Sequence, residues 1–164
     1  PATGHGLSTF DVPRVVSNTV KIGPLKTQSD AIGKLLTNTE KTAFSVVTLS
    51  EEMPVMEAIE LIEGVKNKLH IGLGPIFFNS LASTPFSGKD KEVIKQNTAN
   101  DETKEILKIV KLALKRAEMN DLYLSNFQKD FPKIDIVAFP FLFKEIKKIE
   151  DLKPLVEICC LQKS

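Results

Sequence analysis

The sequence predicts an α/β fold in which a parallel sheet is flanked by helices. Three short, largely apolar segments alternate with helical patterns, which is typical of parallel strands joined by helical crossovers. The expected strands are residues 42–49, 76–78 and 134–139. Before them, residues 7–41 have loosely helical apolar spacing that breaks at Gly23-Pro24, and this pattern predicts a short helical hairpin.

Further local signals define the segments between and after these strands. Pro54 suits a first helical position, and Gly72-Leu73-Gly74-Pro75 breaks the helical pattern that follows it. The content of Ser, Thr, Pro, Gly and Asn in residues 81–100 predicts a long loop, after which Asp101 can cap a helix. The expected helices span residues 54–69, 103–119, 121–131 and 152–161.

Charge and hydropathy argue against a nucleic-acid-binding protein and against a membrane-spanning protein. The chain carries 22 Lys and Arg against 21 Asp and Glu, so its net charge of +1 gives no case for a nucleic-acid partner. Its longest apolar runs are about half of the roughly 20 residues that a membrane-spanning helix needs. No basic region followed by an apolar stretch marks a signal peptide. We therefore expect a cytoplasmic protein that does not span a membrane.

The two cysteines, Cys159 and Cys160, are neighbours near the end of the chain. Neighbouring side chains on a helix point about 100° apart, so this pair does not form the paired thiolates of a C-x-x-C metal site. We expect buried, reduced thiols and no metal site.

Candidate functional residues follow each expected strand, at the sheet edge where α/β proteins bind ligands. Glu51 and Glu52 come after the first strand, where they favour the dipole of the next helix. Asn79 comes after the second; its carboxamide can pair with the edge of adenine, although asparagine is also a common turn residue. The third strand leads into an aromatic segment, residues 139–143.

Two glycine-containing segments invite comparison with phosphate-binding loops. Thr3-Gly4-His5 can form a turn whose amide groups face a phosphate, but such residues also occur in ordinary turns. Ser87-Gly88-Lys89-Asp90 contains Gly-Lys, yet it lacks the earlier glycine and the following Ser or Thr of a P-loop. We interpret the second segment as part of a loop.

In combination, these motifs resemble the family of arsenical-pump ATPases and tail-anchored-protein-targeting ATPases. The matching segments are Thr3-Gly4-His5, residues 48–54, Phe78-Asn79 and residues 139–143. The resemblance runs from the family's second switch motif to its C-terminus and covers essentially the whole chain. It implies the C-terminal part of a P-loop ATPase domain, with a switch loop at 1–6, a helical segment at 7–41 and an α/β portion at 42–164. The P-loop itself is expected upstream.

The resemblance also implies roles for individual residues. Thr3, Gly4 and His5 would act in the switch that responds to the γ-phosphate, where His5 could serve as a general base. Asn79 would read adenine. Of the aromatic segment, Pro140 and Phe141 would face the ligand. Phe139 and Phe143 are expected to be core residues, as apolar side chains of a strand and its end commonly are. Glu51 would either support a helix or contact the nucleotide or a dimer partner.

The function that follows by resemblance is ATP binding and hydrolysis with Mg, coupled to a dimer switch in a complete bacterial arsenical-pump-like protein. The segment alone is expected to be inactive without the P-loop. Residues 1–158 contain no cysteine, so neither zinc clamping nor thiol-based arsenite sensing is expected. The client protein or membrane pump stays open. Two alternatives remain: a noncatalytic scaffold that binds a partner or apolar peptide through residues 7–36, and a half-domain that self-associates.

Overall fold

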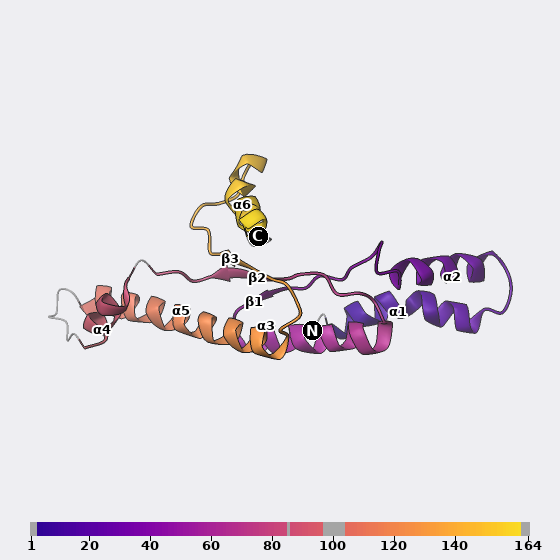
Figure 1. Cartoon of the computed structure of the whole chain (residues 1–164), viewed down its shortest axis with the longest axis horizontal. Coiled ribbons are helices and arrows are strands. Elements are labelled where there is room, and N and C mark those ends of the chain that lie inside the picture. Colours follow the sequence, from indigo (N-terminus) through magenta and orange to yellow (C-terminus); the bar gives the residue numbers. More distant parts are fainter. Residues whose placement is uncertain (1–2, 85, 97–103, 162–164) are drawn as a thin grey trace. The chain divides into compact units, whose positions relative to one another are not determined.

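The computed structural model describes residues 3–84, 86–96 and 104–161, and the side chains of residues 3, 95 and 159–161 are outside the described set (Figure 1). The elements are α1 (Thr3–Thr19), α2 (Pro24–Leu36), β1 (Val47–Leu49), α3 (Glu52–Gly64), η1 (Val65–Leu69), β2 (Ile76–Leu81), α4 (Gly88–Gln96), α5 (Lys104–Asp130), β3 (Ile136–Pro140), η2 (Ile149–Leu152) and α6 (Lys153–Leu161). The expectation of buried thiols at Cys159 and Cys160 therefore lies outside the described side chains.

The three strands form one parallel sheet in the order β1-β2-β3, with helices flanking it. This arrangement confirms the predicted α/β class. The first strand is shorter than expected, because residues before Val47 contribute only an isolated parallel bridge between Phe44 and Leu73. The second strand is longer and runs to Leu81.

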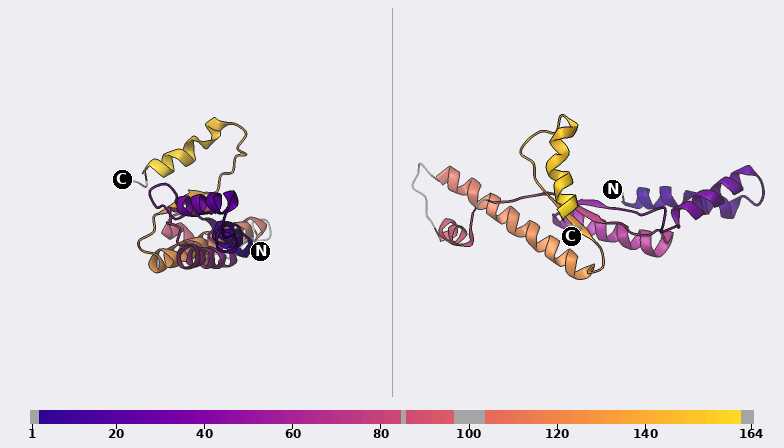
Figure 2. Two further views of the ribbon diagram at one scale, coloured as in Figure 1. Left: turned by 90° about the vertical axis from the view of Figure 1, so that its right-hand side faces the viewer. Right: turned by 45° about the horizontal axis from the view of Figure 1, so that its top comes forward.

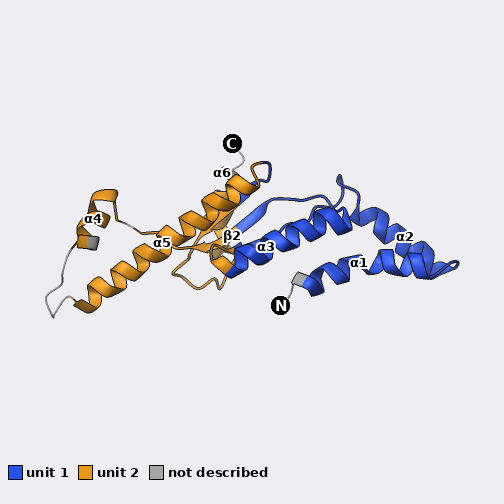
Figure 3. Cartoon of the chain, turned by 90° about the horizontal axis from the view of Figure 1, so that it is seen from below, with its two compact units in different colours: residues 1–48, 53–77, 133–136 blue, residues 49–52, 78–132, 137–164 orange. Residues whose placement is uncertain are grey.

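The chain divides into two compact units, which we describe separately (Figure 3). The first contains Pro1–Thr48, Met53–Phe77 and Lys133–Ile136. The second contains Leu49–Glu52, Phe78–Pro132 and Val137–Ser164. The segments that follow the three strands all belong to the second unit.

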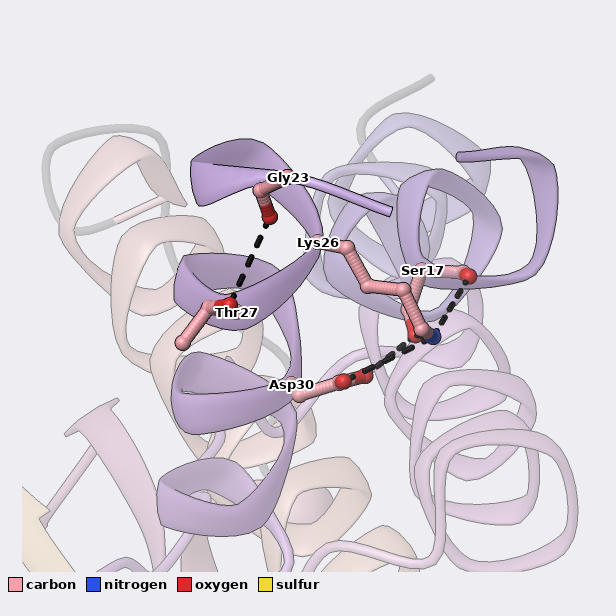
Figure 4. Close-up of polar contacts among 5 residues, drawn as sticks. All are labelled: Ser17, Gly23, Lys26, Thr27 and Asp30. Atoms are coloured by element: carbon pink, nitrogen blue, oxygen red, sulfur yellow. Dashed lines mark hydrogen bonds and ion pairs between the residues drawn. The ribbon is translucent and has the colours of Figure 1, made fainter. Parts of the chain in front are cut away.

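In the first unit, α1 and α2 form the expected helical hairpin (Figure 2). Pro24 occupies the start of α2, and Gly23 before it has a φ of 117°, a conformation that glycine adopts without strain. Ser17 on α1 donates a short hydrogen bond to Asp30 on α2, and the Lys26 ammonium lies 3.1 Å from the Ser17 carbonyl oxygen (Figure 4). These polar contacts join the two helices near the turn.

The helix that follows β1 confirms the prediction for residues 54–69, although its last turn differs from an α-helix. It runs as α3 to Gly64 and continues as a π-helical turn, η1, to Leu69. His70 ends it in the left-handed region at a φ of 56°. Gly64 permits close packing in this unit, because a Cβ there would lie 2.5 Å from Cδ1 of Leu7.

In the second unit, one long helix, α5, replaces the two helices predicted over residues 103–119 and 121–131. The expected break fell at Asn120, a residue type that commonly ends helices. Here Asn120 is buried, and its side chain bonds to Ser50 and Ala82 instead of competing for the helix backbone. The helix therefore continues. The predicted cap, Asp101, lies outside the described residues.

The prediction of an uninterrupted loop over residues 81–100 was wrong, because α4 forms within it. Asp90 accepts hydrogen bonds from the Ser87 hydroxyl group at 2.6 Å and from the Ser87 backbone N–H at 2.9 Å. The Ser87 hydroxyl group holds the pKa of Asp90 below its ordinary value, with the backbone bond adding to it. The Asp90 backbone N–H in turn donates to the Ser87 hydroxyl oxygen at 3.4 Å, and this reciprocal cap stabilises the start of α4 at Gly88.

The core of the second unit is built on aromatic packing between β2 and α5. Phe78 and Phe127 are both fully buried, and their rings meet edge to face at a centroid distance of 5.1 Å. Phe131 packs on Phe127 at 4.8 Å. Leu114 and Ala117, on earlier turns of α5, are also buried. This packing holds α5 beside the strand ends.

Candidate functional site

The segments after the three strands meet at the sheet edge where ligands were expected. Phe141 donates its backbone N–H to the carbonyl oxygen of Leu81 at 2.9 Å, so the end of β3 is joined to the end of β2. Ser50 follows β1 and is buried. This edge of the second unit is the candidate functional site.

Asn120 on α5 holds two of these strand ends together. Its amide nitrogen donates to the Ser50 carbonyl oxygen at 2.6 Å, and its amide oxygen accepts from the Ala82 N–H at 2.8 Å. The Ser50 hydroxyl group donates to the Asn120 carbonyl oxygen at 2.6 Å. The sequence interpretation missed this residue; a single asparagine within an apolar helical pattern was the available signal.

Glu51, predicted to contact the nucleotide or a dimer partner or to support a helix, forms an ion pair in the structure. Its carboxylate lies 3.1 Å from the guanidinium of Arg116 on α5, and both side chains are about half exposed. An ion pair at this exposure contributes little to stability because water screens it. The pair nevertheless places a carboxylate next to the buried Ser50 contact.

Asn79 lies inside β2 and not after it, because the strand continues to Leu81. Its side chain is exposed. The next residue, Ser80, has a φ of 58°, which is uncommon for a residue with a Cβ and interrupts the regular alternation of side chains along the strand. Unusual backbone conformations of this kind are concentrated at functional sites.

A polar pocket of about 340 Å³ opens at the ends of β2 and β3. Pro140, one of the two residues predicted to face the ligand, lies in its wall. Asn79 and Phe141 are not among its lining residues. The pocket is lined by Leu81, Ala82, Ser83, Thr84, Lys91, Ala117, Asp121, Ala138 and Pro140.

Phe141 instead lines a neighbouring hollow of about 400 Å³ together with Phe143, and their rings meet edge to face at 5.0 Å. Phe141 is 48% exposed, as a ligand-facing residue can be. The prediction that Phe143 is a core residue was wrong, because 91% of it is exposed. Phe139, within β3, is partly buried.

The predicted switch residues lie in the first unit and have a different conformation from the expected loop. Thr3, Gly4 and His5 form the first turn of α1, where Gly4 and His5 accept hydrogen bonds from Ser8 and Thr9. The prediction of a loop at this point was therefore wrong, because glycine did not prevent these residues from joining the helix. Residues 1–2 of the proposed switch lie outside the described residues.

A second pocket of about 320 Å³ lies between the helices of the hairpin in the first unit. Three of its charged lining residues, Asp11, Arg14 and Asp30, already have partners. Arg14 forms two hydrogen bonds to Asp11, at 2.6 and 2.7 Å, and these bonds hold the pKa of that carboxyl group below its ordinary value. Asp30 is held by Ser17 and Lys26. This pocket therefore offers a ligand fewer unpaired groups than the pocket at Pro140.

The described residues offer neither a metal-binding cluster nor a membrane-spanning helix. Among the described residues, no group of three or more His, Cys, Asp or Glu side chains is arranged to hold a metal ion. In the same part of the chain, the helices are too short or too polar to cross a bilayer.

Comparison with known proteins relates part of the chain to ATPases. Over 79 residues the chain is 37% identical to ATPase BagA of Mycobacterium tuberculosis (strain ATCC 25618 / H37Rv), a match that covers 48% of this chain and 23% of that protein. The same figures hold for Mb3704 of Mycobacterium bovis and MT3781 of Mycobacterium tuberculosis (strain CDC 1551 / Oshkosh). No family model matches the chain. About half of the chain is thus similar to a named ATPase, and the match spans under a quarter of that relative.

Proposed function

We propose that this chain supplies the part of an ATPase that binds the nucleoside end of ATP. The observation that carries the proposal is the meeting of β2 and β3 at one sheet edge, where Pro140 lines an open pocket beside the exposed Asn79. Parallel α/β sheets bind ligands at this edge. The similarity of about half of the chain to ATPase BagA supports ATP as the ligand and favours this function over that of a noncatalytic scaffold.

In this proposal the two sides of the base are recognised differently. Pro140 provides a rigid apolar surface for the flat face of adenine, and Phe141 is close enough in sequence to close over it after a small change in its loop. Asn79 provides a donor and an acceptor for the edge of the base. The side chain of Asn79 would have to turn toward the pocket, from a strand end that Ser80 already distorts.

The wider function follows the family that the sequence resembles. The complete protein would be cytoplasmic, bind ATP with Mg through a P-loop, and couple hydrolysis to the closing of a dimer in an arsenical-pump-like ATPase. Thr3, Gly4 and His5 would act as a switch, since the first amide groups of a helix can also bind an anion. Glu51 would contact the nucleotide or the dimer partner after leaving Arg116.

The test is nucleotide selectivity in the full protein that contains this segment. We would measure the dissociation constants of ATP and GTP for the wild type and for Asn79→Ala. Losing a paired hydrogen bond to the base is expected to reduce the preference for ATP over GTP by about tenfold or more, since such a pair contributes about 1–3 kcal/mol. The matched control is Asn18→Ala, an exposed asparagine on α1 of the first unit.

Both variants should unfold at the same urea concentration as the wild type, because both side chains are exposed. An unchanged preference for ATP over GTP in Asn79→Ala would contradict the adenine role. A wild-type protein that binds neither nucleotide would contradict the proposed function as a whole.

A further inference from the structure

The pocket at Pro140 is lined by both apolar and polar residues. The side chains of Ala82, Ala117 and Ala138 lie in its wall, and their small size leaves open space between β2, β3 and α5. Hydroxyl groups come from Ser83 and Thr84. A lining of small apolar side chains with a few polar groups is typical of a small-molecule site.

Two opposite charges line this pocket without pairing. Lys91 comes from α4 and Asp121 from α5. In the described part of the chain neither side chain forms an ion pair, with the other or elsewhere, unlike Arg14 and Asp11 in the pocket of the first unit. Both groups are therefore available to a ligand.

This combination of charges limits the chemistry of the ligand. A simple anion would be attracted by Lys91 but repelled by Asp121. A simple cation would be attracted by Asp121 but repelled by Lys91. A neutral group with several hydroxyl groups suits both, because its O–H groups donate to a carboxylate and its oxygens accept from an ammonium group. Bonds between hydroxyl groups and charged groups are also stronger than bonds between neutral groups.

The size of the pocket also favours a small ligand with several hydroxyl groups. A volume of about 340 Å³ lies at the low end of the range of about 300–1,000 Å³ for small-molecule sites, so the pocket suits a sugar or part of a nucleoside better than a whole nucleoside triphosphate. A pentose carries adjacent hydroxyl groups, and a base attached to it could extend toward Pro140.

We infer that this pocket binds the ribose of the nucleotide, with Asp121 accepting hydrogen bonds from its 2′- and 3′-hydroxyl groups and Lys91 donating to its oxygens. The inference rests on the proposed function and deepens it from a nucleotide to a ribonucleotide. Asp121 directly follows Asn120, whose buried hydrogen bonds fix this turn of α5 against the strand ends. The backbone at Asp121 is thereby positioned before the ligand arrives, which lowers part of the ordering cost of binding.

The experiment compares ATP with 2′-deoxyATP and 3′-deoxyATP in the full protein. The wild type should bind ATP about tenfold or more tightly than either deoxy analogue, because each analogue loses a hydrogen bond to a charged group. In Asp121→Ala, affinity for ATP should fall to that for the analogues, so that the ratio approaches one. Lys91→Gln should weaken all three nucleotides while leaving a reduced preference for ATP.

Two control variants separate this inference from the adenine role. Asp130→Asn changes an exposed carboxylate at the end of the same helix and should keep the wild-type ratio of ATP to 2′-deoxyATP. Asn79→Ala should change the preference between ATP and GTP but not the preference for ribose. Urea unfolding would confirm that each variant folds, and the conservative Asp121→Asn replaces Asp121→Ala if the latter does not.

The outcomes distinguish a failure of the ribose inference from a failure of the proposed nucleotide function. If Asp121→Ala still binds ATP and keeps the wild-type preference over the deoxy analogues, the ribose inference is overturned while the nucleotide function stands. If the wild type binds all three nucleotides equally, ribose is not recognised and the inference is again overturned. If the wild type binds no nucleotide, both proposals fail together.

Discussion

The side-chain amide of Asn120 donates a hydrogen bond of 2.6 Å to the carbonyl oxygen of Ser50, which lies 70 residues earlier in the chain. The Ser50 hydroxyl group returns a bond of 2.6 Å to the Asn120 carbonyl oxygen. Both residues are buried, so water cannot replace either bond without opening the unit. The contact fixes α5, with Arg116, Ala117 and Asp121, against the edge where the strands end.

We predict that Asn120→Ala destabilises the protein by about 1–3 kcal/mol, because it leaves the Ser50 carbonyl oxygen and the Ala82 N–H buried without their partners. The higher helix propensity of alanine offsets about 0.5 kcal/mol of this cost. Urea unfolding followed by circular dichroism measures the change. The matched control is Asn126→Ala, which replaces an exposed asparagine on the same helix and should not destabilise it.

Equal unfolding midpoints for Asn120→Ala and Asn126→Ala would contradict this account of the buried bonds. The variant Asn120→Asp distinguishes the bond to Ser50 from the bond to Ala82. Aspartate can still accept from the Ala82 N–H but cannot donate to the Ser50 carbonyl oxygen, and it buries a charge. It should therefore be at least as destabilising as alanine at neutral pH.

A second prediction concerns two phenylalanines of the second unit. Phe127 is 1% exposed and packs on Phe78, whereas Phe143 is 91% exposed. Phe127→Ala should cost about 3–5 kcal/mol, since it leaves a cavity in a packed core. Phe143→Ala should change stability by less than about 0.5 kcal/mol. Thermal unfolding of both variants checks this, and a large effect at Phe143 would show that its ring is covered in solution.

The strands and most helices were predictable because their signals are local. Runs of β-branched and aromatic residues marked β1, β2 and β3, and Gly23-Pro24 marked the turn of the hairpin. The continuity of α5 through Asn120 was not predictable, because the bonds that stabilise this asparagine come from residues distant in sequence. Equally, no local pattern showed that Thr3-Gly4-His5 would extend α1.

The sequence predicted which edge of the sheet carries the candidate site. It did not predict which residues form the pocket there. Chain order alone brings the residues after parallel strands to one edge, which is why Glu51, Asn79 and Pro140 were candidates. Lys91 and Asp121 were not candidates, because they lie on helices whose packing against the strand ends depends on tertiary contacts. The separation of Pro140 from Phe141 likewise depends on the path of the chain after β3.

A third prediction uses two glycines of the hairpin. Nothing lies within 4 Å of a Cβ built at Gly33, in the interior of α2, so Gly33→Ala should stabilise the protein by about 0.5–1 kcal/mol. Gly23 also has open space, but its φ of 117° is unfavourable for alanine, and Gly23→Ala should destabilise. Urea unfolding distinguishes the two, and a shift in the same direction for both variants would contradict the prediction.

A fourth prediction concerns Asp151 at the start of η2. The Lys144 ammonium, 2.5 Å away, and the backbone N–H groups of Lys147 and Lys148 at 3.1 Å hold the pKa of Asp151 below its ordinary value of 3.8. A carboxylate with a lowered pKa in the folded state stabilises the fold fully above its unfolded-state pKa. This contribution is lost as the pH falls through the lowered, folded-state pKa.

Asp151→Asn should therefore be less stable than the wild type at pH 7, and the difference should shrink as the pH is lowered below about 4. Parallel urea titrations at intervals from pH 7 to pH 2.5 measure it. Lys144→Met tests the cause, because removing the ammonium group should raise the pKa of Asp151 toward 3.8, which NMR titration of the carboxyl group can follow. A difference between Asp151→Asn and the wild type that stays constant over the whole range would show that the charge of Asp151 does not stabilise the fold.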